Sequence, residues 1–351
     1  MSVTLSAFSG TPKAIGQAYG SQFASQISAN LDILVRRRGS DPLPLEDKKF
    51  VSWIECQESL VAKNWPWIKE EMEGVAQGAS AEYNEILLLN LRAWQYEFYG
   101  PGECCSSLAV TLSDGIVACA GALDDPIEYY CGPVKIVPEN GNSFITFPIT
   151  GTSWGNRGMN NRGLAIGISS QILPGLKQLD DAINQDISLR VILQTCSTVS
   201  DVREFCKAFP FTMNLVCADA KGEIFCAHNT SAGLLEMPAE AGYCALTNHV
   251  ADDAFMYWLR SHGVNEFPES STSRYRHGKL LEFARSRNGL CSHSEVMKLI
   301  GLRDDDDMGS INNRGTIYMT YANPPADSQT FWVAESVSAG EYAQFVPYSL
   351  G

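Results

Sequence analysis

The chain turns from helix to strand at Gly102-Glu103-Cys104-Cys105-Ser106-Ser107-Leu108-Ala109-Val110. A helical pattern ends just before it, near residues 99–101, and an alternating apolar segment typical of a strand follows it. Two adjacent cysteines are poorly placed to bond to one another. If the peptide bond before Cys105 breaks, Cys105 becomes the first residue of a strand, with a thiol and a free α-amine. One residue would then carry both a nucleophile and its base.

The region before this junction is predicted to be mainly helical. Thr11-Pro12 has the form of a helix start. Apolar residues then recur every four positions, which predicts one amphipathic helix facing a core. This stripe consists of Ile15, Tyr19, Phe23, Ile27, Leu31 and Val35. Further helices are predicted over 50–63, 67–77 and 84–98.

The region after the junction is predicted to mix strands and helices. Ser113-Asp114-Gly115 has the composition of a hairpin turn between two short strands. Strands are predicted over 107–112, 116–119, 134–137, 143–149, 163–169, 214–218, 223–227, 245–248, 316–321 and 330–334, and helices over 186–196, 199–208, 273–285 and 292–299. This order predicts a layered α+β fold with antiparallel sheets. No internal repeat or long linker divides the chain, so we expect one domain over 1–351.

The charge and hydropathy of the chain narrow its possible partners. The formal net charge is −14 over 351 residues, which argues against nucleic-acid binding. No window of about 18 apolar residues exists, so no membrane partner is expected. The first residues lack the charged and apolar regions of a secretory leader, and we therefore expect a cytoplasmic protein.

The eleven cysteines are an odd number, scattered through apolar surroundings. This distribution predicts reduced thiols that serve mostly as small core residues. There is no Cys-x-x-Cys pair and no cluster of cysteine with histidine, so we expect no zinc site and no other metal. The acidic run 304–307 lacks the ligand spacing of an EF-hand and is interpreted as a solvated loop.

Several short motifs share their order and spacing with a known family. They are Gly10-Thr11-Pro12, Ile15-Gly16, Gly20-Ser21, Trp65-Pro66, Glu70-Glu71, Gly74-Val75-Ala76, Gly78, Glu85-Ile86, Leu89-Asn90-Leu91-Arg92, Cys105-Ser106-Ser107, Gly158-Met159-Asn160, Gly163-Leu164-Ala165 and Thr247-Asn248-His249. With them the chain resembles, nearly end to end, the family of acyl-coenzyme A:6-aminopenicillanic-acid acyltransferase, or isopenicillin N acyltransferase. That family also contains N-β-alanyl-amine hydrolases.

The resemblance implies an N-terminal-nucleophile hydrolase with a four-layer αββα sandwich, two stacked and mainly antiparallel sheets between helical layers. Such enzymes cleave themselves before a cysteine and use it for acyl transfer. The implied cut lies between Cys104 and Cys105 and gives fragments 1–104 and 105–351, which stay together as a heterodimer.

The resemblance also implies roles for residues further along the chain. Asn248 would donate to an oxyanion, and Asp125 would assist processing and catalysis. Asn214 resembles a position that faces the substrate pocket, and His249 and Arg314 are further candidates for substrate binding.

Three alternatives stay open at this point. The family usually has Gly before the nucleophile, so the cut could instead precede Cys104. Asp124 rivals Asp125, because the segment lacks the Asn and aromatic that usually precede the acid. The penicillin acyltransferase has an Arg where this chain offers Asn313 or, in a shifted alignment, Arg314.

The predicted chemistry is acyl transfer through a Cys105 thioester, without a cofactor. A small-molecule donor, either an amide or a thioester such as an acyl-coenzyme A, would acylate the thiol, and water or an amine would accept the acyl group. Two other functions remain possible. One is an unprocessed, non-catalytic relative that binds a small acylated ligand. The other is a thiol hydrolase with a Cys105/His249 dyad, although adjacent strand residues such as Asn248 and His249 face opposite ways.

Overall fold

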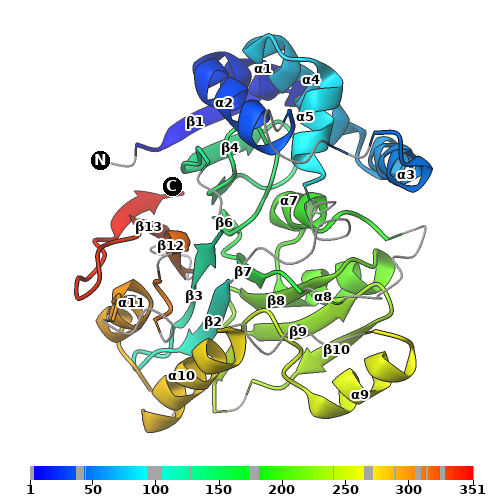
Figure 1. Cartoon of the computed structure of the whole chain (residues 1–351). Helices are drawn as coiled ribbons and strands as arrows, with labels where there is room; N and C mark the ends of the chain where they lie inside the picture. Colours follow the sequence, from blue (N-terminus) through cyan, green and yellow to red (C-terminus); the bar gives the residue numbers. More distant parts are fainter. Residues whose placement is uncertain are drawn as a thin grey trace.

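The structure is a computed structural model, in which the fold and its layers are seen in Figure 1. It describes residues 4–36, 43, 45–92, 105–125, 129–171, 173, 182–239, 241–264, 272–287, 290–304, 310–313, 315–324 and 329–350. Of the sequence candidates, Cys104 and Arg314 lie outside these described residues.

Two sheets form the centre of the molecule. In the described residues, sheet A has eight strands in the order β1 (Ser6–Gly10), β4 (Val134–Pro138), β5 (Phe144–Thr146), β6 (Gly158–Asn160), β7 (Ala165–Ser169), β8 (Met213–Ala218), β9 (Ile224–Thr230) and β10 (Gly233–Met237). Sheet B has six in the order β11 (Tyr243–Leu246), β2 (Ser106–Thr111), β3 (Val117–Asp124), β12 (Thr316–Asn323), β13 (Thr330–Glu335) and β14 (Val346–Ser349). Apart from the parallel pair β1–β4, neighbouring strands are antiparallel.

The sheets stack face to face and helices cover their outer faces (Figure 1). One apolar core, which includes Cys105, Met159 and Val216, lies between the sheets. A second core joins sheet B to α10 (Ser273–Ser286) and α11 (His293–Gly301). On sheet A lie α7 (Gln185–Thr195) and α8 (Val199–Ala208). The predicted four-layer αββα sandwich is therefore confirmed.

The N-terminal helices form a separate group above sheet A (Figure 1). They are α1 (Pro12–Gln22), α2 (Ala24–Leu34), α3 (Lys48–Asn64), α4 (Pro66–Ala79) and α5 (Tyr83–Asn90). The single helix predicted from the first apolar stripe is wrong, because the chain leaves helical geometry at Phe23. The ring of Phe23 packs on Phe8 and Tyr19, with centroids 6.2 and 5.2 Å away. The stripe stays continuous because both helices bury it against the same core.

The contact between α1 and α4 explains four of the glycines in the motifs. A Cβ at Gly16 would lie 2.1 Å from the Glu71 carbonyl oxygen, and one at Gly74 would lie 2.3 Å from that of Lys13. Gly20 and Gly78 repeat the arrangement one turn later. The two helix backbones thus touch directly, as small residues spaced four apart permit.

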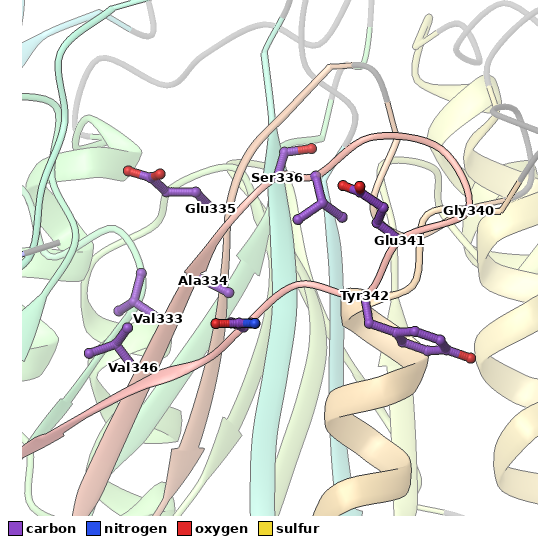
Figure 2. Close-up of a pocket in the computed structure, with 10 residues that line it drawn as sticks. Val333, Ala334, Glu335, Ser336, Gly340, Glu341, Tyr342 and Val346 are labelled. Carbon is purple, nitrogen blue, oxygen red and sulfur yellow. The ribbon is translucent and has the colours of Figure 1, made fainter. Parts of the chain in front are cut away.

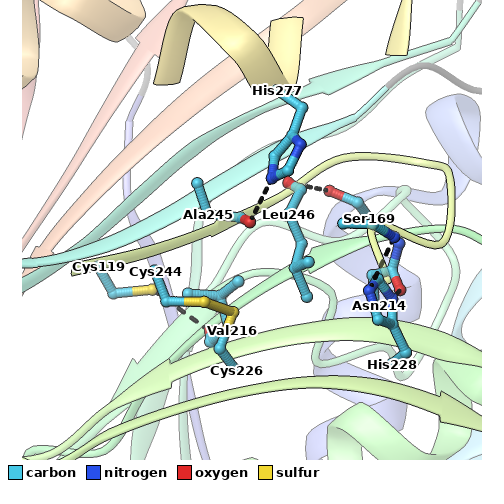
Figure 3. The surroundings of a disulfide bond; sticks show 11 residues. Cys119, Ser169, Asn214, Val216, Cys226, His228, Cys244, Ala245, Leu246 and His277 are labelled. Carbon is cyan, nitrogen blue, oxygen red and sulfur yellow. Dashed lines mark hydrogen bonds between the residues drawn. A yellow bond between two sulfur atoms is a disulfide. The ribbon is translucent and has the colours of Figure 1, made fainter. Parts of the chain in front are cut away.

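The expectation that all cysteines are reduced is wrong for one pair. Cys226 on β9 and Cys244 on β11 form a disulfide that joins sheet A to sheet B (Figure 3). Eight other cysteines lie in the described part of the chain, and most of them are buried. The count of cysteines could not reveal the pair, because its members meet only when the two sheets stack.

Short elements with weak patterns were missed from sequence. They are β1, β6, β10, β14 and α9 (Asp253–Ser261). Among the described helices, none has the length and apolar character needed to cross a bilayer.

Candidate active site

Cys105 immediately precedes β2, one of the inner strands of sheet B, and its side chain is fully buried in the core between the sheets. The strand forms because Leu108 and Val110 face the helical layer while Cys105 and Ala109 face sheet A. The last paired residues of β11 and β2 are Leu246 and Ser107. Continued for two residues, this register brings Asn248 opposite Cys105.

Arg276 joins these two residues. It lies on α10 and is fully buried. One terminal nitrogen, Nη1, donates to the Cys105 carbonyl oxygen and to the Ser106 hydroxyl, both at 2.6 Å. The other, Nη2, donates to Asn248 Oδ1 at 2.9 Å. Because Oδ1 is held on the side of α10, the Asn248 amide nitrogen points the other way, where it donates to the Ser170 carbonyl at 3.0 Å.

The backbone around Asn248 is fixed on both sides. The hydroxyl of Ser273 accepts from the backbone N–H of Asn248 at 2.8 Å and from that of His249 at 3.1 Å. On the side of sheet A, Asn214 Nδ2 donates to the carbonyls of Thr247 and His249. Asn214 is fully buried, and its amide nitrogen binds backbone carbonyls.

His228 holds Asn214 in place (Figure 3). Its Nε2 accepts from the backbone N–H of Ala251 at 3.0 Å, so Nδ1 carries the proton and donates to Asn214 Oδ1 at 2.6 Å. Gln171 also donates to Asn214 Oδ1. Burial lowers the pKa of His228 to about 4, which keeps the ring neutral.

His249 belongs to the face turned toward α10. Its Nδ1 lies 2.8 Å from the Ser273 hydroxyl, and its ring meets that of His277 edge to face at 5.2 Å. Burial lowers its pKa to about 3. The Cys105 side chain belongs to the opposite, inter-sheet face, and this geometry does not favour a Cys105/His249 dyad.

The two acidic candidates follow one another at the end of β3 and have different partners. Asp125 pairs with Arg92 at 2.6 Å, and both side chains are buried. Asp124 accepts from the Thr316 hydroxyl at 2.6 Å and from Asn313 Nδ2 at 2.9 Å. Burial raises the pKa of Asp124 to about 6, and the charge of Arg276 acts in the opposite direction.

A second buried arginine approaches from sheet A. Arg157 has no exposed surface, and its guanidinium donates to the carbonyls of Ser106, Ala122 and Ile168. It occupies the space beside Gly121, where an added Cβ would lie 2.4 Å from Nη1. Arg276 and Arg157 therefore place buried positive charge on the two sides of sheet B.

Sequence reasoning missed both arginines. Arg276 falls on the buried stripe of its helix, with Ser273, Leu280 and Ala284. A charged residue on such a stripe is a signal for a buried, partnered side chain. Arg157 stands in an irregular segment before β6 and had no such signal.

A hollow of about 800 Å³ lies elsewhere, under the segment that joins β13 to β14 (Figure 2). Its walls include Glu335, Glu341, Tyr342 and Val346. None of the predicted site residues lines it.

The comparisons with known proteins identify a related family for part of the chain. Residues 127–298 match the family model of acyl-coenzyme A:6-aminopenicillanic acid acyl-transferase. This match agrees with the family resemblance predicted from the sequence motifs. The matched region contains Asn214, Asn248 and Arg276 and begins after Cys105. The αββα sandwich is the fold of the N-terminal-nucleophile hydrolases, to which the family belongs.

Two solved structures are similar to this chain in outline. A variant of conjugated bile acid hydrolase from Clostridium perfringens has 12% identity and a TM-score of 0.49, over 70% of this chain and 92% of that one. The Caenorhabditis elegans orthologue of N-acylethanolamine-hydrolyzing acid amidase has 11% identity and a TM-score of 0.46, over 63% and 93%. We draw nothing about substrate from these distant likenesses.

Proposed function

We propose that the chain is a self-processing enzyme that transfers acyl groups through a thioester on Cys105. The observation that carries the proposal is the bridge formed by Arg276 between the Cys105 carbonyl and Asn248 Oδ1. It directs the Asn248 amide toward sheet A, the side on which the Cys105 thiol also lies. A nucleophile and an oxyanion donor on the same face of sheet B fit acyl transfer.

Processing is the first step of the proposed mechanism. The Cys105 thiol attacks the carbonyl of residue 104, and the peptide nitrogen leaves as the α-amine of Cys105. Water then opens the resulting thioester. An α-amine has an unperturbed pKa of about 7.7–8.0, so a useful part of it is neutral near pH 7. That amine accepts the thiol proton in each later cycle, and no histidine is required as a base.

Acyl transfer follows on the exposed cysteine. The thiol attacks the donor carbonyl, and Asn248 Nδ2 with a backbone N–H stabilises the oxyanion. The leaving group departs with the proton held by the α-amine. Water or an amine then opens the thioester. Arg276 acts as a positioning residue, and the positive charge of Arg157 favours the negative charge that develops beside it.

The role of the acidic residue in processing and catalysis can be divided between the adjacent residues Asp124 and Asp125. Asp124 lies within the field of Arg276, whereas Asp125 pairs with Arg92 of the N-terminal region. We therefore infer that Asp124 serves the chemistry and that Asp125 anchors the segment upstream of Cys105. Asp124→Asn should slow acylation, and Asp125→Asn should mainly slow processing. The reverse pattern would restore the role to Asp125.

The intact mass of the purified protein tests the proposal. We expect fragments 1–104 and 105–351 from the wild type and one full-length chain from Cys105→Ala. Cys119→Ala is the matched control, since Cys119 is also a buried thiol of the inter-sheet core. A wild type that remains whole and still turns over substrate would refute the role of the α-amine. A cut before Cys104 would move the nucleophile by one residue.

A second assay separates hydrolysis from transfer. The processed protein is given an N-acyl amino acid or a short acyl-coenzyme A, with and without an added amine. If the chain is a transferase, the amine diverts the product from acid to amide. If it is an amidohydrolase, the acid remains the product. Failure to form any Cys105 adduct with either donor would favour a non-catalytic binding protein.

A further inference from the structure

The disulfide lies close to the segment that carries Asn248. Cys244 is on β11, the edge strand of sheet B, and Asn248 follows two residues after that strand ends. Cys226 is on β9, an inner strand of sheet A, where it pairs with Val216 and Met237. The bond is thus a covalent tie between the sheets, just before the proposed oxyanion donor (Figure 3).

A pocket is lined by one of the two bonded cysteines and not by the other. It has a volume of about 170 Å³, lies between β11, the end of β10 and α10, and counts Cys244 among its lining residues. Met237, Leu246 and Leu281 give it apolar walls. Cys226 does not line it. The exposed fractions agree, at 7% for Cys244 and 1% for Cys226.

The pocket has a positive rim. Arg285 lines it, is exposed, and forms no ion pair with any residue that the structure describes. His277 also lines it, with Nε2 3.1 Å from the Ala245 carbonyl. Burial lowers the pKa of His277, so this ring is neutral and Arg285 supplies the charge. None of the described residues that line the pocket carries a carboxylate.

We propose that this pocket is a thiol–disulfide exchange site for a small thiol that carries a carboxylate. The carboxylate pairs with Arg285, and the carbon chain lies on the apolar walls. The thiolate attacks Cys244 Sγ, a bond forms between these sulfurs, and the bond between Cys244 and Cys226 breaks. Cys226 leaves as a thiolate and takes up the proton that the incoming thiol released. The products are a mixed disulfide on Cys244 and a free thiol on Cys226, with no net oxidation.

The exchange would act on the proposed active site from a distance. It removes the covalent tie of β11 and leaves the Asn248 segment held by hydrogen bonds, among them those with Asn214, Ser273 and Arg276. Attack of the Cys226 thiol on the adduct restores the tie. The site is independent of the proposed acyl transfer, because its modification can be measured without any substrate.

The test uses three thiols of similar size on the full-length wild-type protein. Mercaptopropionate carries a negative charge, mercaptoethanol none, and cysteamine a positive charge. After acid quenching, free thiols are alkylated and the protein is digested without reduction. We expect the adduct on Cys244 and the alkyl group on Cys226. At equal thiolate concentration, mercaptopropionate should react about three- to tenfold faster than mercaptoethanol, and cysteamine should be slowest.

Variants of two exposed arginines distinguish positive charge at the pocket from positive charge elsewhere on the surface. Arg285→Gln should remove the difference between the thiols, and Arg285→Lys should restore most of it. Arg162→Gln removes the same charge outside the pocket, from another exposed position, and should change nothing. Adducts mainly on Cys226, equal rates for the three thiols, or no adduct on the native protein would each overturn the proposal.

Discussion

The contact between α1 and α4 and the contact around Arg276 are both buried, but they are built in opposite ways. The first is made where side chains are absent, by glycines whose backbones touch. The second is made by a guanidinium that satisfies three acceptors on two other elements. The first requires only space, so one methyl group should break it. The contact around Arg276 requires hydrogen-bond partners, so removal of the guanidinium leaves several buried polar atoms unpaired.

The largest effect is expected at the glycine contact. Gly16→Ala adds a Cβ 2.1 Å from the Glu71 carbonyl, and the two helices must move apart. We expect a loss of unfolding free energy on the order of 3 kcal/mol, measured by urea denaturation. Gly278→Ala is the control, because this helical glycine has open space around it. It should be neutral or slightly stabilising. Equal stabilities for both variants would contradict the close contact.

Arg276 should matter most for turnover. Arg276→Met leaves the Cys105 carbonyl without its donor and frees the Asn248 amide to rotate. We expect kcat to fall by about 10²–10³, as for loss of an oxyanion donor, together with slower processing. Arg276→Lys should recover little, since one ammonium cannot span these acceptors. Lys279→Met, on the same helix but paired at the surface with Asp304, should leave kcat unchanged.

A smaller effect on kcat is expected at Asn214, which positions the segment around Asn248. Asn214→Ala releases the carbonyls on both sides of Asn248, and we expect kcat to fall about tenfold with little change in KM. Asn229→Ala is matched to it, because Asn229 is equally buried and donates to a carbonyl, that of Phe211, outside the site. If both variants lose stability but only Asn214→Ala loses kcat, the positioning role is supported. Equal losses of kcat would reduce Asn214 to a structural residue.

The last prediction concerns the pH dependence of stability. The pKa of Asp124 rises from 3.8 to about 6 on folding, mainly through burial. Between these values the folded state binds more protons than the unfolded state, so stability should decrease as pH rises through this window. The contribution is at most about 3 kcal/mol. Asp124→Asn should flatten this part of the profile, as seen by denaturation at several pH values. An unchanged slope would assign the titration to another group.

The comparison also explains what could be predicted from the sequence. Cys105 and Asn248 stand in short local motifs, and the strand that follows Cys105 has a clear alternation. The order of the elements predicted a layered α+β fold with antiparallel sheets, and the family resemblance implied the αββα layers. The glycines at 16, 20, 74 and 78 were noted only as motif positions, although their spacing already describes a helix contact.

The parts that could not be predicted depend on residues that come together only in the tertiary structure. Arg157 bonds to carbonyls on three strands, and no side-chain pattern records such partners. Cys226 and Cys244 meet only across the stacked sheets. The break at Phe23 was hidden because the apolar stripe continues through it. Each of these features is set by tertiary packing and not by local periodicity.

The parallel pair β1–β4 has a consequence for how the protein can be taken apart. β1 comes from the chain before Cys105 and forms the border of a sheet whose other strands all come after it. Asn30 adds further hydrogen bonds between its side chain and the backbone of Tyr130 and Thr150. Whatever happens to the backbone ahead of Cys105, the two halves should co-purify under native conditions. Separating them would require melting, and neither half is expected to be recovered folded by itself.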